Sequence, residues 1–257
     1  MVEKNKEKIN YYPAGQKVEL LAPAGNLEKL KIAILYGADA VYCGGYNYGL
    51  REGADNFTME ELKEAVDYAH RHQARIYVTV NMIPHNADLV GLPEYLHQLE
   101  GLGVDALIVS DPGIMSIIRE EGIKLPLHLS TQANTVNWAS VRFWQEQGIE
   151  RVILARELSR EEIKEIREKT DMELEIFVHG AMCISYSGRC LLSNYMAARD
   201  ANRGKCAHSC RWKYYLVEER RPGQYFPITE DERGTYILNS KDLCLIEHIP
   251  EIIEAGV

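Results

Sequence analysis

Four cysteines lie close together in one stretch of the chain, and their type and spacing make them the best candidates for chemistry. They are Cys183, Cys190, Cys206 and Cys210, in the pattern C-x6-C, fifteen residues, C-x3-C. Thiolates at this density usually share a metal centre or form disulfides. The spacing alone leaves open a four-thiolate iron–sulfur cluster, a structural zinc site, or buried thiols without a metal. We favour the cluster, because zinc sites usually contain two C-x2–4-C pairs and only Cys206 and Cys210 approach one.

Basic residues flank these cysteines. Arg189, Lys205 and Arg211 would offset the negative charge of the thiolates and of any anionic substrate. The other two cysteines, Cys43 and Cys244, stand in strand-like or helix-start contexts, and we expect both to be core residues.

The composition indicates one large, acidic domain. The chain has 257 residues, 46% of them hydrophobic, and a net charge of −9, which is enough apolar content for a substantial core. Any nucleic-acid surface must therefore be local. The first residues are charged and polar, unlike a secretory signal, and no apolar run is long enough to cross a membrane. We expect a cytoplasmic, reducing location, where clustered cysteines favour metal or redox roles over disulfides.

Short apolar segments alternate with amphipathic ones, which predicts a parallel α/β fold. Seven strands are expected, at residues 18–22, 40–43, 75–81, 106–110, 125–130, 151–155 and 173–179. Asn26, Thr58 and Ser159 are expected to cap helices between them. Length and regularity favour a TIM-like (β/α)8 barrel over a doubly wound sheet, and no G-x-G-x-x-G follows the first strand.

The strand-and-helix rhythm changes after the seventh predicted strand. Residues 180–240 form what we call the Cys-rich insertion, within a barrel domain covering 18–257 that follows a flexible segment, 1–17. Residues 212–217 and 235–238 are expected to be paired strands. A helix is expected over 249–255, and the next residues would lead into an eighth strand. We therefore expect the barrel to be truncated before its last strand.

Polar side chains follow several of the predicted strands, at the end of a barrel that carries active sites. The candidate substrate-binding residues are Arg51, Asn81, Ser130, Gln132, Asn134, Arg156, Glu157, His179 and Lys241. Among them Arg51, Arg156 and Lys241 are suited to hold a carboxylate. Single members have simpler explanations, because Ser130 could cap a helix and His179 could be a hydrogen-bonded core histidine. No G-x-S-x-G or H-E-x-x-H motif is present, so the catalytic residues stay unassigned.

Longer stretches resemble the collagenase-like peptidase family (peptidase family U, number 32). Residues 177–183 and 187–193 are similar to its cysteine-containing signature. The stretches LLAPAGN (20–26), GADAVYCGG (37–45), SDPG (110–113) and NSKDL (239–243) look similar to its tRNA uridine hydroxylation branch. The resemblance covers nearly the whole chain from Val18 onward.

The resemblance implies dioxygen-independent hydroxylation rather than proteolysis, with the peptidase activity of the family name as the alternative. It implies a [4Fe-4S] cluster on Cys183, Cys190, Cys206 and Cys210, with zinc or no metal after purification in air. The implied reaction makes 5-hydroxyuridine at the wobble position of tRNA, with prephenate as hydroxyl source and an unassigned electron donor. Related branches act on ribosomal RNA or on quinone precursors. A further strand and a C-terminal domain, absent from this chain, are also implied.

The Cys-rich insertion is also where we expect RNA to bind. Its aromatic residues Tyr186, Tyr195, His208 and Trp212 could stack on bases. Its basic residues, with one just beyond Trp212, could contact phosphates: Arg189, Arg199, Arg203, Lys205, Arg211 and Lys213. The alternative is that the aromatic side chains pack against the barrel.

Overall fold

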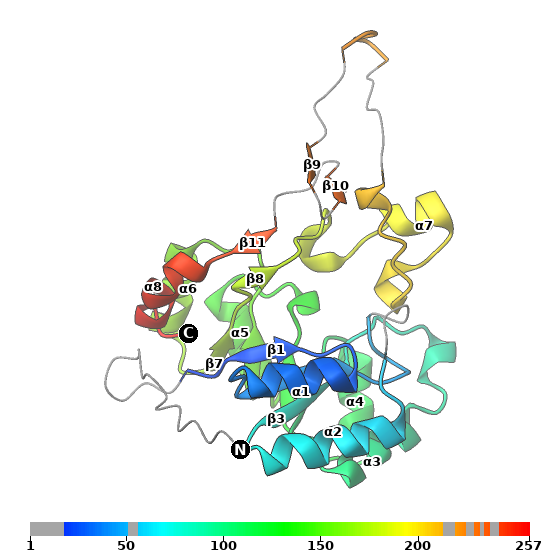
Figure 1. Ribbon diagram of the computed structural model, residues 1–257, viewed down its shortest axis with the longest axis vertical. Helices are drawn as coiled ribbons and strands as arrows, with labels where there is room; N and C mark the ends of the chain where they lie inside the picture. The colour runs from blue at the N-terminus through cyan, green and yellow to red at the C-terminus, as the bar shows by residue number, and fades with distance from the viewer. Residues whose placement is uncertain (1–17, 51–55, 213–218, 225–228, 232–233, 237–241) are drawn as a thin grey trace, which may run out of the picture.

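The computed structural model describes residues 18–50, 56–212, 219–224, 229–231, 234–236 and 242–257 (Figure 1). Seven parallel strands form its main sheet, in chain order: β1 (Leu21–Pro23), β2 (Ala40–Gly44), β3 (Arg75–Val80), β4 (Ala106–Val109), β5 (Leu127–Leu129), β6 (Arg151–Ile153) and β7 (Glu173–Glu175). The sheet curls into an incomplete barrel, and within the described residues β1 and β7 are its two edges. The TIM-like architecture expected from the sequence is thereby confirmed.

Two predicted strands differ from those observed. β1 begins only at Leu21, because the backbone N–H of Leu20 is bound by the carboxylate of Asp39, 3.0 Å away. The predicted strand over 173–179 divides in two. β7 ends at Glu175, and β8 (His179–Gly180) pairs antiparallel with β11 (Leu243–Cys244), away from the main sheet.

Helices connect the strands: α1 (Leu27–Leu35), α2 (Met59–Arg71), α3 (Leu92–Leu102), α4 (Pro112–Glu120), α5 (Trp138–Glu146) and α6 (Arg160–Lys169). The predicted caps are present. The side chain of Asn26 caps α1, and Thr58 and Ser159 form capping boxes with glutamates three positions later. Each box satisfies backbone N–H groups that the first turn leaves without partners. None of the helices formed by the described residues is both long and apolar enough to span a bilayer.

The apolar core has two parts, one on each face of the sheet. Residues of β2 to β6 that point outward, such as Val41, Val78 and Leu107, pack against the helices. The residues that alternate with them along the strands point inward, and they form a smaller cluster inside the barrel that includes Tyr77 and Ile108. This alternation follows from the two-residue period of a strand.

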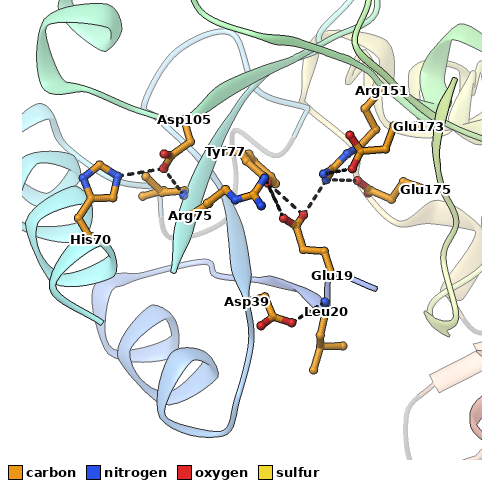
Figure 2. A network of polar contacts seen from close by, with 11 residues as sticks. Glu19, Leu20, Asp39, His70, Arg75, Tyr77, Asp105, Arg151, Glu173 and Glu175 are labelled. Carbon is orange, nitrogen blue, oxygen red and sulfur yellow. Dashed lines mark hydrogen bonds and ion pairs between the residues drawn. The ribbon is translucent and has the colours of Figure 1, made fainter. Parts of the chain in front are cut away.

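A polar network fills the barrel base, which is the N-terminal end of the strands (Figure 2). Arg151, at the start of β6, is 4% exposed and pairs with Glu19 at 2.7 Å, Glu173 at 2.6 Å and Glu175 at 3.3 Å. The hydroxyl of Tyr77 donates to Glu19, 2.9 Å away. Because Glu19 precedes β1 and Arg151 lies beside β7, the network joins the two edges of the open sheet.

Burial changes the ionisation of this network. Burial disfavours the charged form of Arg151 and so acts to lower its pKa. The hydrogen bond to Glu19 and the negative charge of Glu19 outweigh this and hold the pKa of Arg151 above its ordinary value. Burial raises the pKa of Glu175 to about 7, although Arg151 acts against that rise. Burial, with the nearby Arg151 and Arg75, lowers the pKa of His128 to about 3. The histidine is therefore neutral at physiological pH.

The Cys-rich insertion leaves the barrel after β8 and carries η3 (Tyr186–Gly188), α7 (Leu192–Ala197), η4 (Ala201–Arg203) and η5 (Ser209–Arg211). Figure 1 shows this part projecting beyond the strands, on the side opposite the barrel base. The predicted strand at 212–217 falls mainly outside the described residues. β10 (Gly234–Tyr236) overlaps the predicted strand at 235–238, and it pairs with β9 (Thr229–Asp231). α8 (Ile249–Glu254) confirms the last predicted helix.

Candidate functional site

The thiol of Cys210 is influenced by the other three cysteines of the insertion. Burial raises the pKa of Cys210, and electrostatic interaction with Cys183, Cys206 and Cys190 raises it further, while Arg211 acts against the rise. Backbone N–H groups are directed at two of the four sulfurs, from Ser185 to the Sγ of Cys183 and from His208 to the Sγ of Cys206, both at 3.4 Å. Such N–H groups stabilise thiolates in iron–sulfur sites. All six cysteines are free.

The donor set is compatible with an iron–sulfur cluster. The described part of the chain contains no group of three or more His, Cys, Asp or Glu side chains placed to hold one metal ion. A four-iron cluster does not need such convergence, because each of its four thiolates binds a different iron. Four soft sulfur donors, two of which accept a backbone N–H group, fit that cofactor chemically.

Glu157, just beyond β6, fixes the loop between the first two cysteines. Its carboxylate accepts the backbone N–H of Ser187 at 2.6 Å and the hydroxyl of the same serine at 2.7 Å. Ser187 is completely buried and has a φ of 42°, in the left-handed region that residues other than glycine rarely adopt. The two hydrogen bonds hold the serine in this conformation and attach the insertion to the barrel mouth, the C-terminal end of the strands.

A second attachment joins the insertion to β5. Gly188 has a φ of 85°, and any side chain at this position would collide with the side-chain nitrogen of Gln132. Arg189 donates through Nε to the backbone carbonyl of Gln132 at 3.1 Å. Beside them, Arg156 donates to the carbonyl of Ala181 at 3.0 Å. Three residues that the sequence nominated for substrate binding, Gln132, Arg156 and Glu157, therefore contact the Cys-rich insertion.

Asn202 makes a third attachment, which acts on a cysteine directly. Its side chain accepts the N–H of Cys190 at 3.0 Å and donates to the carbonyl of Cys190 at 3.1 Å. Its own carbonyl accepts the N–H of Ile83, in the loop after β3, at 3.0 Å. The next residue, Arg203, makes a bidentate ion pair with Asp88 of the same loop and holds the pKa of Asp88 below its usual range.

Beneath the insertion, the strand ends present polar atoms that are buried without hydrogen-bond partners. Asn81 donates to the hydroxyl of Ser130 at 3.1 Å, so the ends of β3 and β5 meet. Among the described residues, the orphan atoms at this end of the barrel are Asn81 Oδ1, Thr131 Oγ1, Asn134 Oδ1, Thr135 Oγ1 and Arg156 Nε. Buried polar atoms without partners are costly, so they mark a place where a ligand or water completes the hydrogen bonds.

The remaining predicted residues divide into several groups. Arg51, Lys213 and Lys241 lie outside the described residues. His179 lies in β8 and is exposed, so it is not a core histidine. Cys43 is buried as predicted, but the core prediction is wrong for Cys244, which is exposed in the two-residue strand β11.

The basic and aromatic residues predicted to contact RNA lie mostly on the surface of the Cys-rich insertion. Arg189, Arg199, Lys205, Tyr186, Tyr195, His208 and Trp212 are exposed. Arg211 is less exposed and pairs with Asp242 at 3.6 Å.

Sequence reasoning missed Ser187, Asn202, Thr131, Thr135 and Asp88. Thr131 and Thr135 could have been found, because they flank the nominated residues of the same loop. Ser187 and Asn202 carry no such signal, since their importance comes from contacts with distant loops.

Comparison with known proteins gives a consistent set of similarities. The sequence model of peptidase family U32 matches residues 25–257. The chain is 52% identical to tRNA hydroxylation protein P1 of Bacillus subtilis (strain 168), over 94% of this chain and 57% of that protein. It is 45% identical to tRNA hydroxylation protein P of Escherichia coli (strain K12), over 94% of this chain and 62% of that protein. The chain therefore spans about three-fifths of the length of these relatives.

A solved structure supports the fold. The U32 peptidase Mk0906 matches with a TM-score of 0.56 and 17% sequence identity, over 67% of this chain and 73% of that one. At that identity the likeness concerns the arrangement of strands and helices alone.

Proposed function

The chain belongs to peptidase family U32, and from that premise we propose that it hydroxylates RNA, converting a tRNA uridine to 5-hydroxyuridine. Its identities of 52% and 45% to proteins named for tRNA hydroxylation support the proposal. The structural observation that carries it is the attachment of a four-thiol insertion to the barrel mouth by Glu157 and Asn202. Active sites of (β/α)8 barrels form at this end of the strands.

We propose that Cys183, Cys190, Cys206 and Cys210 hold a [4Fe-4S] cluster. The N–H groups directed at two of the sulfurs would stabilise the thiolate form that binds iron. When bound, the cluster would supply electron transfer or an iron that polarises an oxygen ligand. Zinc is the alternative occupant that these thiols would accept.

The hydroxyl group must come from a second molecule, which we propose to be a prephenate-type carboxylate. In the balanced exchange, the C5–H bond of uracil is broken and a C5–OH bond forms. In the donor molecule, the C–OH bond is broken and a C–H bond forms. Two electrons pass from the base to the donor. Orphan polar atoms at the barrel mouth, including the Nε of Arg156, would bind and orient this molecule. Asn81, Ser130 and Asn134 lie in the same region and complete the candidate site.

The reaction can be tested in cells that lack their own tRNA hydroxylation proteins and express this chain. We expect 5-hydroxyuridine in their tRNA with the wild-type chain, and none when the four insertion cysteines are replaced by serine. Cys244→Ser is the matched control, because Cys244 is exposed and lies outside the insertion. In anaerobic analysis, the wild type and Cys244→Ser should contain iron and sulfide, and the variant without the four insertion cysteines should contain neither. An iron-loaded wild-type chain that forms no 5-hydroxyuridine would overturn the proposal.

The same proteins distinguish the alternatives. The peptidase activity of the family name predicts cleavage of denatured collagen that depends on the four cysteines, with hydroxylation of tRNA unaffected by their loss. Hydroxylation of another substrate predicts modified nucleosides in ribosomal RNA, or a modified quinone precursor, while tRNA remains unmodified.

A further inference from the structure

The outer face of α7 carries large apolar side chains that are exposed. Leu191 is 77% exposed, Tyr195 is 87% exposed and Met196 is 38% exposed. Leu191 and Tyr195 are four residues apart, so their side chains lie on the same side of this short helix. Large apolar side chains gathered on a surface indicate an interaction site.

This face is firmly connected to the thiol site. Ser193 is buried, and its hydroxyl donates to the carbonyl of Arg199 at 2.7 Å and accepts the N–H of Ala207 at 2.9 Å. α7 also packs against η5, which contains Cys210. The rear of α7 is therefore held by the segment that carries the last two cysteines, while its front faces solvent. In Figure 1, α7 lies at the outer side of the insertion.

The charge around α7 identifies the kind of partner. Residues 180–212 contain five basic residues and one acidic residue, whereas the whole chain has a net charge of −9. Two of the five, Arg203 and Arg211, form ion pairs with Asp88 and Asp242. The other three, Arg189, Arg199 and Lys205, are exposed. A local group of positive charges on an otherwise acidic protein attracts a polyanion such as RNA. Exposed aromatic and basic side chains together are the combination that binds unpaired nucleotides, through stacking on the base and ionic contact with the phosphate.

We propose that the exposed face of α7 is the platform on which an unpaired base of the substrate RNA stacks. Tyr195 provides the ring, Leu191 extends its apolar surface, and Arg199 lies exposed at the end of the helix for a phosphate. The inference rests on the proposed RNA hydroxylation and assigns its recognition surface. The platform belongs to the same insertion as the four thiols, because the rear of α7 is held by the segment that contains Cys206 and Cys210.

The test is binding of a fluorescent RNA stem-loop with an unpaired, uridine-containing loop, measured by anisotropy at one salt concentration. Tyr195→Ala should weaken binding about tenfold, because it removes one stacking contact, whereas Tyr195→Phe should bind as the wild type does. Tyr36→Ala is the matched control, since Tyr36 is 85% exposed at the end of α1 and far from the insertion in sequence. Binding of a fully paired duplex should be equal in all four proteins.

The outcomes separate this inference from the proposed function. If the wild type and Tyr195→Ala bind the stem-loop equally, or if Tyr195→Phe loses as much affinity as Tyr195→Ala, the stacking platform is wrong while RNA hydroxylation stands. If the wild type does not bind the stem-loop, both proposals fail. Equal iron content and equal circular dichroism in the variants exclude misfolding as the cause of weaker binding.

Discussion

The carboxylate of Glu157 and the loop residue Ser187 are joined by two hydrogen bonds, one from the backbone N–H and one from the hydroxyl. This pair attaches the segment between Cys183 and Cys190 to the end of β6. The position of the cysteines therefore depends on a barrel residue that is not itself a sulfur ligand.

Replacing Glu157 should weaken retention of the cluster. Glu157→Ala removes both acceptors and leaves the buried Ser187 hydroxyl and N–H without partners, so we expect roughly tenfold poorer iron retention on dilution into a chelator. Iron and sulfide content under anaerobic conditions measures this. Glu161→Ala is the control, because Glu161 is 76% exposed on α6. Equal retention in the two variants would show that the Ser187 contact does not position the cysteines.

Asn202 should matter for a different cysteine. Asn202→Ala removes the two side-chain hydrogen bonds to the backbone of Cys190, and we expect faster loss of iron in air than in the wild type. Asn202→Asp keeps the acceptor for the Cys190 N–H and should have an intermediate effect. Asn194→Ala, on the exposed side of α7, is the control. The visible absorbance of the cluster followed over time gives the rates, and identical rates for Asn202→Ala and Asn194→Ala would contradict the prediction.

The barrel base should contribute strongly to stability. Glu19→Gln keeps a hydrogen-bond acceptor for Tyr77 but removes the negative charge that pairs with the buried Arg151. We therefore expect a loss of roughly 3 kcal/mol in the free energy of unfolding. Glu64→Gln breaks the exposed Lys31–Glu64 pair and should cost less than about 1 kcal/mol. Urea denaturation of the two variants provides the comparison. Similar small losses would mean that the base network does not hold the sheet edges together.

Glu175 should make stability depend on pH. Its pKa of about 7 in the folded chain lies above its ordinary value of 4.5. Between these values the folded state binds more protons than the unfolded state, so stability decreases as pH rises from about 5 to about 7. Glu175→Gln cannot ionise, and its stability relative to the wild type should rise by about 2 to 3 kcal/mol between pH ~5 and pH ~8.

The comparison with the wild type isolates Glu175 from its neighbours. Arg151, Glu19 and Glu173 face the same carboxyl group and are present in both proteins. His128, whose low pKa gives the opposite pH dependence below its ordinary value of 6.5, is also common to both. Unfolding curves over this pH range should therefore differ only through Glu175. A stability difference that is constant with pH would contradict a raised pKa.

Local sequence signals predicted the fold better than the site. The capping boxes at Thr58 and Ser159 were predictable because the partners are three residues apart and obey a general rule of helix starts. The alternating burial of the strands followed from their two-residue period. The edge strands were harder, because side-chain contacts such as Asp39 with Leu20 decide where pairing begins.

The contacts that position the site were not predictable. Glu157 and Ser187 are 30 residues apart, and Arg203 and Asp88 are 115 residues apart. No periodicity connects such pairs, and only the closure of the sheet brings them together. Cys244 was misassigned for a related reason, since its apolar neighbours resemble a core segment, but within the described residues β11 pairs with the two-residue β8 and no other strand.

The pairing of Glu19 with Arg151 lies at the barrel base, whereas Glu157 attaches the Cys-rich insertion at the barrel mouth. The residues that keep the scaffold folded are consequently separate from those that would recognise a nucleotide. Substitutions of exposed side chains around the thiols are therefore expected to leave the ion pairs of the barrel base intact.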